Sequence, residues 1–191
     1  MKLVFATHNK NKLREVKSLM PLHIELLSLD DIGCSEDIPE TSKTIEGNAL
    51  IKSRFVKDHY GYDCFADDTG LEVEVLNNAP GVYSARYAGE ACDPKANIEK
   101  LLGELKNYTV RNARFKTVIA ISTGKDEFLF TGICEGEIME TPKGEMGFGY
   151  DPIFKPKGFE NTFAEMLLEQ KSRIGHRGKA IRKLIAYLSG E

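Results

Sequence analysis

The sequence contains 191 residues, of which 41% are hydrophobic and 29% are charged, and its formal net charge is −3. This length and composition are typical of a globular protein with a substantial core, so we expect residues 1–191 to form one domain. The small negative charge excludes the basic footprint of a nucleic-acid binder, and no apolar run approaches the length of a membrane span. We therefore expect no nucleic acid and no membrane as partner.

The cysteines stand far apart, at positions 34, 64, 92 and 134, and form no Cys-x-x-Cys pattern, which argues against a zinc site. The N-terminal apolar stretch, residues 1–6, is too short for a signal peptide. Both features predict a cytoplasmic protein with reduced thiols.

A short buried strand is predicted at residues 3–6, followed by a polar loop at residues 7–12. Apolar residues at helical spacing then continue to Met20, and Pro21 ends this helix. Such a helix start can bind an anion through its N–H groups and the positive end of its dipole. A solvated basic turn explains the same residues equally well.

The next elements are a strand at residues 23–29 and an acidic loop that ends near Glu40. A helix follows, with Thr44 as its N-cap and Tyr60 near its end. Lys52 lies on this helix and is either a ligand for an anion or a surface lysine.

Asp67 and Asp68 follow a short apolar run and precede an alternating apolar pattern at residues 71–76. This spacing predicts a tight turn between two strands. Adjacent carboxylates repel each other unless a cation lies beside them, and oxygen ligands suit a hard cation such as magnesium. Ordinary turn chemistry is the alternative, since Asp and Gly favour turns by themselves.

In the second half, a helix is predicted at residues 93–106, with Asp93 as N-cap, and a hairpin at residues 114–139 with its turn at 123–126. A short helix at residues 162–168 precedes a dense basic patch at 171–179 and a C-terminal amphipathic stripe. The stretch 147–154 combines glycines with aromatic rings, which can cover a flat ligand or form a buried turn.

Six sequence blocks occur in order along nearly the whole chain: residues 6–12, 40–52, 66–71, 79–87, 147–154 and 171–178. In this combination the sequence resembles the inosine/xanthosine triphosphate pyrophosphatases, which remove deaminated purine nucleotides. The resemblance implies an α/β fold that is elongated and two-lobed, built around a mixed, twisted β-sheet with flanking helices and a ligand cleft between the lobes. It also implies a homodimer.

The implied reaction is hydrolysis of a purine nucleoside triphosphate (ITP, dITP or XTP) to the nucleoside monophosphate and pyrophosphate. The implied cofactor is Mg2+, held by Glu40, Asp67 and Asp68, with Asp68 as the proton acceptor. The implied contacts to the phosphates are Thr7, His8, Asn9, Lys10, Asn11, Lys12 and Lys52, and Thr69 is implied to hold the substrate through its hydroxyl or backbone. The implied base pocket is Phe148, Gly149, Tyr150, Asp151, Lys171, His176 and Arg177.

The sequence departs from the pattern of that family at three positions. His8 stands where glycine is common, Thr69 where serine is common, and Gly175 where serine is usual. None of these is a metal carboxylate. Gly175 removes a hydroxyl beside the base pocket, so we expect it to affect selectivity or affinity.

Three other functions remain open on the sequence alone. One is a related pyrophosphatase that acts on modified pyrimidines, and the second is a nucleotide-binding module without catalysis. The third is a nucleic-acid-binding domain that uses the C-terminal basic patch, against which the net charge argues.

Overall fold

The computed structural model describes residues 1–124 and 126–190. The chain divides into two compact units. The first unit comprises Met1–Asp68, Thr117–Gly132 and Arg177–Glu191, and the second comprises Thr69–Lys116 and Ile133–His176. Three strands contribute residues to both units: β3 (Cys64–Val73), β5 (Asn112–Thr123) and β6 (Asp126–Ile138).

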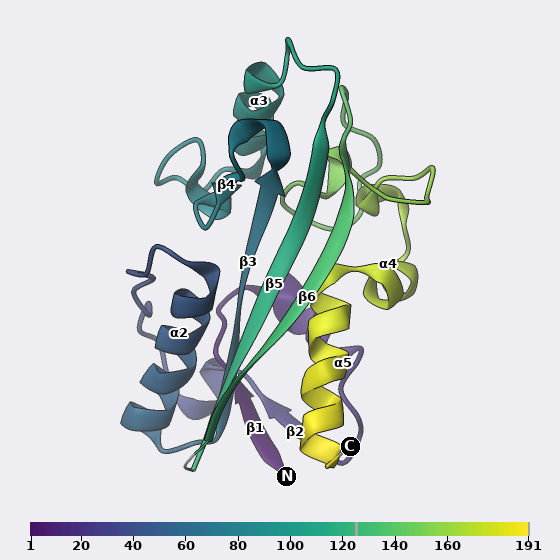
Figure 1. Cartoon of the computed structure of the whole chain (residues 1–191). Coiled ribbons are helices and arrows are strands. Elements are labelled where there is room, and N and C mark those ends of the chain that lie inside the picture. The colour runs from purple at the N-terminus through teal and green to yellow at the C-terminus, as the bar shows by residue number, and fades with distance from the viewer. Residues whose placement is uncertain (125, 191) are drawn as a thin grey trace. The chain divides into compact units, whose positions relative to one another are not determined.

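In the first unit, β1 (Lys2–Phe5) lies between two other strands. It lies parallel to β2 (Glu25–Leu27) and parallel to β3, with Val4 opposite Cys64. The strand order is β2-β1-β3-β5-β6. The helices of this unit are α1 (Lys10–Lys17), α2 (Ile45–Tyr60) and α5 (His176–Ser189), of which α2 and α5 lie beside the strands in Figure 1.

Alternate residues of the central strands bury their side chains in two separate apolar clusters of the first unit. Leu3, Phe5 and Phe65 pack with residues of α1 and α5, and the rings of Phe5 and Phe65 stack at 4.7 Å. Val4 and Ala66 pack instead with Val56 of α2. Because side chains alternate along a strand, one face of β3 looks toward α1 and α5 and the other toward α2.

The helix ends of the first unit follow from local capping. Asn9 caps α1, since its side chain accepts hydrogen bonds from the N–H groups of Asn11 and Lys12. Thr44 caps α2 in the same way, and Gly61 ends α2 in the left-handed region at φ 74°. The predicted bounds of α2 are therefore confirmed.

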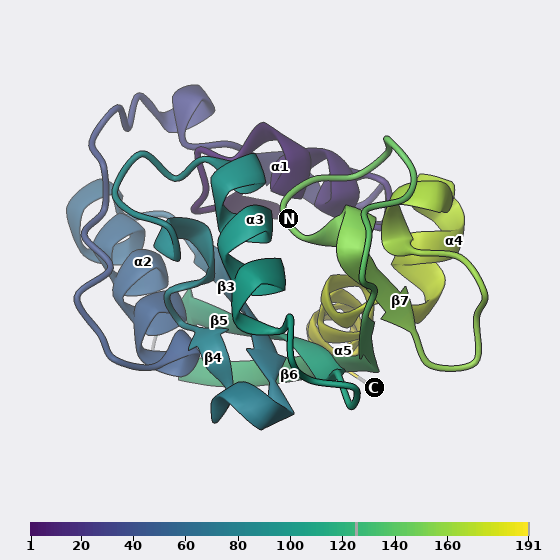
Figure 2. The ribbon, with the colours of Figure 1, turned by 90° about the horizontal axis from the view of Figure 1, so that it is seen from above.

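In the second unit, β4 (Ala79–Gly81) pairs antiparallel with β3, and β7 (Phe154–Pro156) pairs antiparallel with β6. The helices α3 (Pro94–Glu104) and α4 (Leu168–Ile174) belong to this unit and are labelled in Figure 2. Its core contains residues of the strands, of α3 and of the later loops, among them Leu71, Leu101, Phe115, Phe154 and Phe163.

Three details of the secondary structure differ from the prediction. The expected turn at Asp67 and Asp68 is wrong, because both residues lie inside the ten-residue strand β3. The expected helix at residues 162–168 is also wrong. A single 3-10 turn, Phe163–Glu165, is closed there by a capping box between Thr162 and Glu165, and α4 begins only at Leu168. The C-terminal helical stretch is broken at Gly175.

The hairpin of β5 and β6 is confirmed, although Lys125 of its predicted turn lies outside the described residues. The α/β class and the mixed sheet are also confirmed, because parallel and antiparallel pairs both occur. The single domain and the cleft between lobes stay predictions. Within residues 1–124 and 126–190, no helix is long and apolar enough to cross a membrane.

Candidate active site

The two carboxylates of β3 are separated by the pleat of the strand. Asp67 lies on the same face of β3 as Phe65 and therefore points toward α1 and α5. Asp68 lies on the same face as Ala66 and points toward α2. Adjacent acids can therefore occupy a buried strand, because each finds its own cations on its own side.

Asp67 is 1% exposed and holds two cationic side chains. Its Oδ1 accepts from Lys12 Nζ at 2.9 Å, and its Oδ2 accepts from Arg177 Nε at 2.8 Å. Burial by itself would raise the pKa of Asp67, but Lys12 and Arg177 outweigh it and hold that pKa well below its usual range. Asp67 is therefore an ionised anchor for two basic groups.

Arg177 connects Asp67 to Glu15 of α1, a residue that was not predicted as part of the site. Its Nη1 donates to Glu15 of α1, and both side chains are buried. The pattern held a signal for Glu15: it lies three residues after Lys12 and next to the fully buried Val16. Arg177 was predicted to contact the base, and the structure joins its side chain to Glu15 and Asp67 in the first unit.

Asp68 is 7% exposed and faces two residues of α2 that lie one turn apart. Its Oδ2 accepts from Asn48 Nδ2 at 3.4 Å, and its Oδ1 lies 3.8 Å from Lys52 Nζ. Lys52 Nζ also donates to Glu40 Oε1 at 2.5 Å. Burial raises the pKa of the Asp68 carboxyl, and the nearby Lys52 only partly opposes that shift.

Lys12 and Lys52, the lysines beside Asp67 and Asp68, differ in the direction of their pKa shifts. Burial lowers the pKa of Lys12, although Asp67 opposes that shift. Burial also acts to lower the pKa of Lys52, but Asp68 and Glu40 outweigh it and the net shift is upward. Lys52 is thus held firmly as an ammonium ion between carboxylates.

The donor set fits magnesium that is shared with a phosphate ligand. Among residues 1–124 and 126–190, no group of three or more His, Cys, Asp or Glu side chains is arranged to hold a metal by itself. Glu40 and Asp68 nevertheless approach a common cation, the Lys52 ammonium. Magnesium is usually bound by one or two carboxylates together with substrate phosphates and waters, so these two oxygen ligands suit it.

The N-terminal loop is organised by its own side chains. Asn9 Oδ1 accepts from the N–H groups of Asn11 and Lys12, at 3.0 and 3.1 Å. Thr7 Oγ1 accepts from the N–H of Asn9 at 3.2 Å, and His8 Nε2 lies 3.0 Å from the carbonyl oxygen of Glu36. Lys10 begins α1 and is exposed. The side chain of Lys12 is the member of this loop that joins the carboxylate cluster.

In the second unit, Asp151 joins the aromatic block to α4. It is 2% exposed, and its Oδ2 accepts from the N–H of Phe148 at 2.8 Å and from Lys171 Nζ at 2.6 Å. The same ammonium lies 4.8 Å from the centre of the Phe148 ring, a cation–π contact. One carboxylate therefore sets the position of both the ring and the ammonium.

Tyr150 is buried and braces a neighbouring segment of the same unit. Its hydroxyl donates to the carbonyl oxygen of Ser84 at 2.8 Å. Ser84 Oγ in turn donates to Gly81 and accepts from the N–H of Leu71 on β3. The phenol, expected beside a base, thus acts in the structure as a support for residues 81–84.

His176 and Gly175 stand at the junction of α4 and α5. The His176 ring is 3% exposed and stacks on Phe115 at 4.5 Å. Gly175 donates its N–H to the carbonyl oxygen of Lys171 at 2.8 Å, and a Cβ built at Gly175 would lie 2.6 Å from that oxygen. A serine there would require a shift of the backbone that carries Lys171.

The remaining predicted positions are Thr69 and Gly149, and both belong to the second unit. Thr69 is half-buried on β3, and Gly149 adopts φ 61° beside Phe148. The predicted basic patch at 171–179 is only partly a surface feature, because Lys171, His176 and Arg177 are buried whereas Arg173 and Lys179 are exposed.

Replacing Gly147 with Ala tests whether the position of the Asp151 carboxylate contributes to stability. A Cβ at Gly147 would lie 2.0 Å from Asp151 Oδ2, at φ 76°. We expect a loss of about 1–2 kcal/mol in the free energy of unfolding from the left-handed backbone, and about 1–3 kcal/mol more from the displaced carboxylate, measured by urea unfolding.

The matched control is Gly149→Ala, because Gly149 has φ 61° but a Cβ there would meet no atom within 4 Å. This variant should lose only the part of the free energy of unfolding that comes from the left-handed backbone. Equal losses for the two variants would contradict the role given to the Asp151 carboxylate.

Fold and site together define an α/β protein in which buried acids hold lysine and arginine side chains on a mixed sheet. A sequence model of the Ham1 family matches residues 3–187, and the chain belongs to this family.

The relatives of known name span the full chain. The chain is 66% identical over 189 residues to the dITP/XTP pyrophosphatase of Christiangramia forsetii, covering 99% of this chain and 100% of that protein. Among solved structures, the Staphylococcus aureus Ham1 protein matches with a TM-score of 0.91 at 41% identity, covering 100% and 99% of the two chains. A Coxiella burnetii HAM1 protein matches with a TM-score of 0.92 at 36% identity and covers both chains fully.

Proposed function

We propose that the protein hydrolyses deaminated purine nucleoside triphosphates, namely ITP, dITP and XTP, to the monophosphate and pyrophosphate. The observation that carries the proposal is the cluster of half-buried Glu40 with buried Lys52 and Asp68, beside Lys12 and Asp67. This cluster supplies carboxylates for a divalent metal and ammonium groups for phosphates. The name dITP/XTP pyrophosphatase of a relative that is 66% identical supports the same reaction.

On the phosphate side, Lys12 and Lys52 donate to the triphosphate oxygens, and the loop at residues 7–11 surrounds them. Glu40 and Asp68 would hold Mg2+, which would neutralise phosphate charge and acidify the attacking water. Asp67, for which metal binding was also predicted, serves mainly to hold Lys12, because both of its oxygens already accept hydrogen bonds.

Asp68 is the proton acceptor of the proposed reaction. The water oxygen bonds to the α-phosphorus as the bond from that phosphorus to the bridging oxygen breaks, pyrophosphate leaves, and the water proton passes to Asp68. Burial raises the pKa of Asp68 in the protein without metal, and a bound cation would act against that shift. Asn48 holds its second oxygen in place.

On the base side, Phe148 stacks on the purine and Lys171 donates to its 6-keto oxygen. Adenine carries a 6-amino donor at that position, so ATP would place a donor against a donor, a mismatch that costs about 1–3 kcal/mol. A pocket built on hydrogen bonds can reject analogues by several orders of magnitude. GTP shares the 6-keto group, so its rejection depends on the 2-position.

Two further properties belong to the proposal. The protein acts as a homodimer in the cytoplasm, as the family resemblance implies.

The decisive experiment is a pyrophosphate-release assay with Mg2+ that compares ITP, dITP, XTP, GTP, ATP and dUTP. We expect ITP, dITP and XTP to turn over much faster than the rest, and chelation of the metal to stop turnover. Preference for dUTP would instead support a pyrimidine-directed enzyme, and tight nucleotide binding without turnover would support a binding module.

Replacing Asp151 with Asn should weaken base recognition more than chemistry. The variant removes the carboxylate that positions Lys171 and Phe148. We expect KM for ITP to rise about tenfold or more while kcat changes less, because hydrogen bonds to charged groups contribute about 1.5–3 kcal/mol. Steady-state kinetics measure both constants.

The control for this variant is Glu137→Gln, which removes the partner of a more exposed ion pair with Lys155 in the same unit. Its kinetics should match those of the parent. A fall in kcat for Asp151→Asn with KM unchanged would assign this residue to the chemical step and contradict a positioning role.

A further inference from the structure

Lys52 occupies the place between the two carboxylates to which the proposed function assigns the metal. Its side chain is 10% exposed, and its Nζ lies 2.5 Å from Glu40 Oε1 and 3.8 Å from Asp68 Oδ1. The same carboxylates are the proposed magnesium ligands. An ammonium ion and a divalent cation cannot share these oxygens at such distances without strong repulsion.

The charges of the whole cluster favour the same reading. Its acids are Glu15, Glu40, Asp67 and Asp68, and its bases are Lys12, Lys52 and Arg177, so four negative and three positive charges leave a net charge of −1. Each acid lies within 4 Å of at least one of the bases. The protein alone therefore supplies most of the positive charge that these carboxylates require.

We propose that Lys52 is a resident competitor of the metal, so that Mg2+ binds poorly by itself and is taken up together with the triphosphate. The inference rests on the proposed function for the identity of that ligand. The ammonium of Lys52 would move from Glu40 and Asp68 to phosphate oxygens, and these two carboxylates would then hold the metal.

The local structure permits this exchange. Lys52 lies in the middle of α2, whose N-terminus is fixed by Thr44, so its backbone is held while its four-carbon stem can turn. Asn48, one turn earlier, donates to Asp68 and accepts from the N–H of Ser42 at 2.9 Å, which keeps the carboxylate in place when the lysine leaves.

The test measures binding of Mn2+ to the protein without nucleotide. The electron paramagnetic resonance signal of free Mn2+ reports how much metal is not bound. Mn2+ prefers the same oxygen ligands as Mg2+. We expect Lys52→Met and Lys52→Gln to bind Mn2+ at least about tenfold more tightly than the parent, because removing a nearby like charge favours the cation. Equal or weaker binding by both variants would overturn the proposal.

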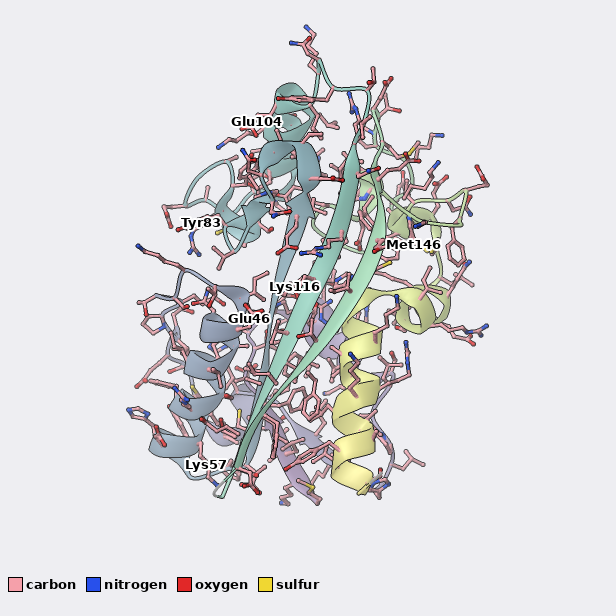
Figure 3. The ribbon with its side chains drawn as sticks, viewed as in Figure 1. Glu46, Lys57, Tyr83, Glu104, Lys116 and Met146 are labelled. Atoms are coloured by element: carbon pink, nitrogen blue, oxygen red, sulfur yellow. The ribbon has the colours of Figure 1, made fainter. Side chains whose placement is uncertain are left out.

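Lys57→Met is the matched control. Lys57 lies on the same helix, as Figure 3 shows, and its Nζ also pairs with a carboxylate, Asp63, at 2.7 Å. This pair is more exposed than that of Lys52 and is separate from the cluster. The variant should bind Mn2+ like the parent, and a gain as large as that of Lys52→Met would show a general charge effect and refute a specific competitor.

A second measurement uses the parent protein and does not depend on the folding of any variant. Reductive methylation of Lys52, followed by mass spectrometry, should be slow without metal and should accelerate as Mn2+ is raised until the site is filled. If Lys52 stays equally unreactive with the site filled, metal and lysine do not compete. Turnover of the parent, measured separately, tests the proposed function itself.

Discussion

Replacing Asp68 with Asn is expected to lower the rate of pyrophosphate release from ITP by about a hundredfold to ten-thousandfold, the usual contribution of a general base. The amide has the same shape but accepts no proton from water, and it also weakens one of the two proposed magnesium ligands. Asp68 is 7% exposed, with Asn48 and Lys52 as neighbours, so the local structure should persist. Single-turnover kinetics would measure the chemical step directly.

The control is Asp63→Asn, which removes a carboxylate just before the same strand. Asp63 pairs with Lys57 and accepts from the N–H of Gly124, away from the cluster. This variant should release pyrophosphate at close to the rate of the parent. If Asp68→Asn also keeps the parent rate, Asp68 is not the proton acceptor, and the centre of the reaction must be sought elsewhere.

Replacing Arg177 with Met should cause the largest loss of stability. Arg177 is 3% exposed and bonds to both Asp67 and Glu15, so its removal takes one cationic partner from each of these buried acids. Breaking a buried ion pair in this way costs about 3–5 kcal/mol. The free energy of unfolding in urea measures the loss.

Arg173→Met provides the comparison within the same C-terminal segment. Arg173 pairs with Glu169 at 3.5 Å, and both side chains are largely exposed. Such a pair contributes about 0–1 kcal/mol, so this variant should be nearly as stable as the parent. Similar small losses for both arginines would contradict the buried chain of charges.

The effect of Arg177 should also depend on pH in a defined direction. The pKa of Asp67 in the folded protein lies below the ordinary value of 3.8, so its ionisation contributes stability that is present above 3.8 and lost as the pH falls further. The difference in the free energy of unfolding between the parent and Arg177→Met should therefore have its full size near neutral pH and decrease below pH 3.8. A gap that grows on acidification would contradict the assignment.

Much of the fold could be predicted from sequence because the signals are local. Thr44 and Gly61 mark the two ends of α2, Asp93 and Pro94 mark the start of α3, and alternating patterns mark the long hairpin. Each signal acts through hydrogen bonds or backbone preferences within a few residues. Such elements therefore form where the sequence predicts them.

The strand at Asp67 and Asp68 could not be predicted in this way. Two adjacent acids favour a turn locally, and only cations from distant segments allow them to lie inside β3. Lys12 comes from α1, Lys52 from α2 and Arg177 from α5. The energy that overrides the local preference is long-range electrostatics in a buried setting, which a local pattern does not contain.

The residue types needed for the chemistry can be recognised in the sequence: the acids, the lysines and the glycine-rich aromatic block occur in the order that resembles a pyrophosphatase family. Which of them face each other depends on the folded chain. It joined Arg177 to Glu15 and Asp67, and it made Asp151 the anchor of Lys171 and Phe148. The physical reason is that a buried charge is stable only beside its partner, and partners far apart in sequence meet only when the chain has folded.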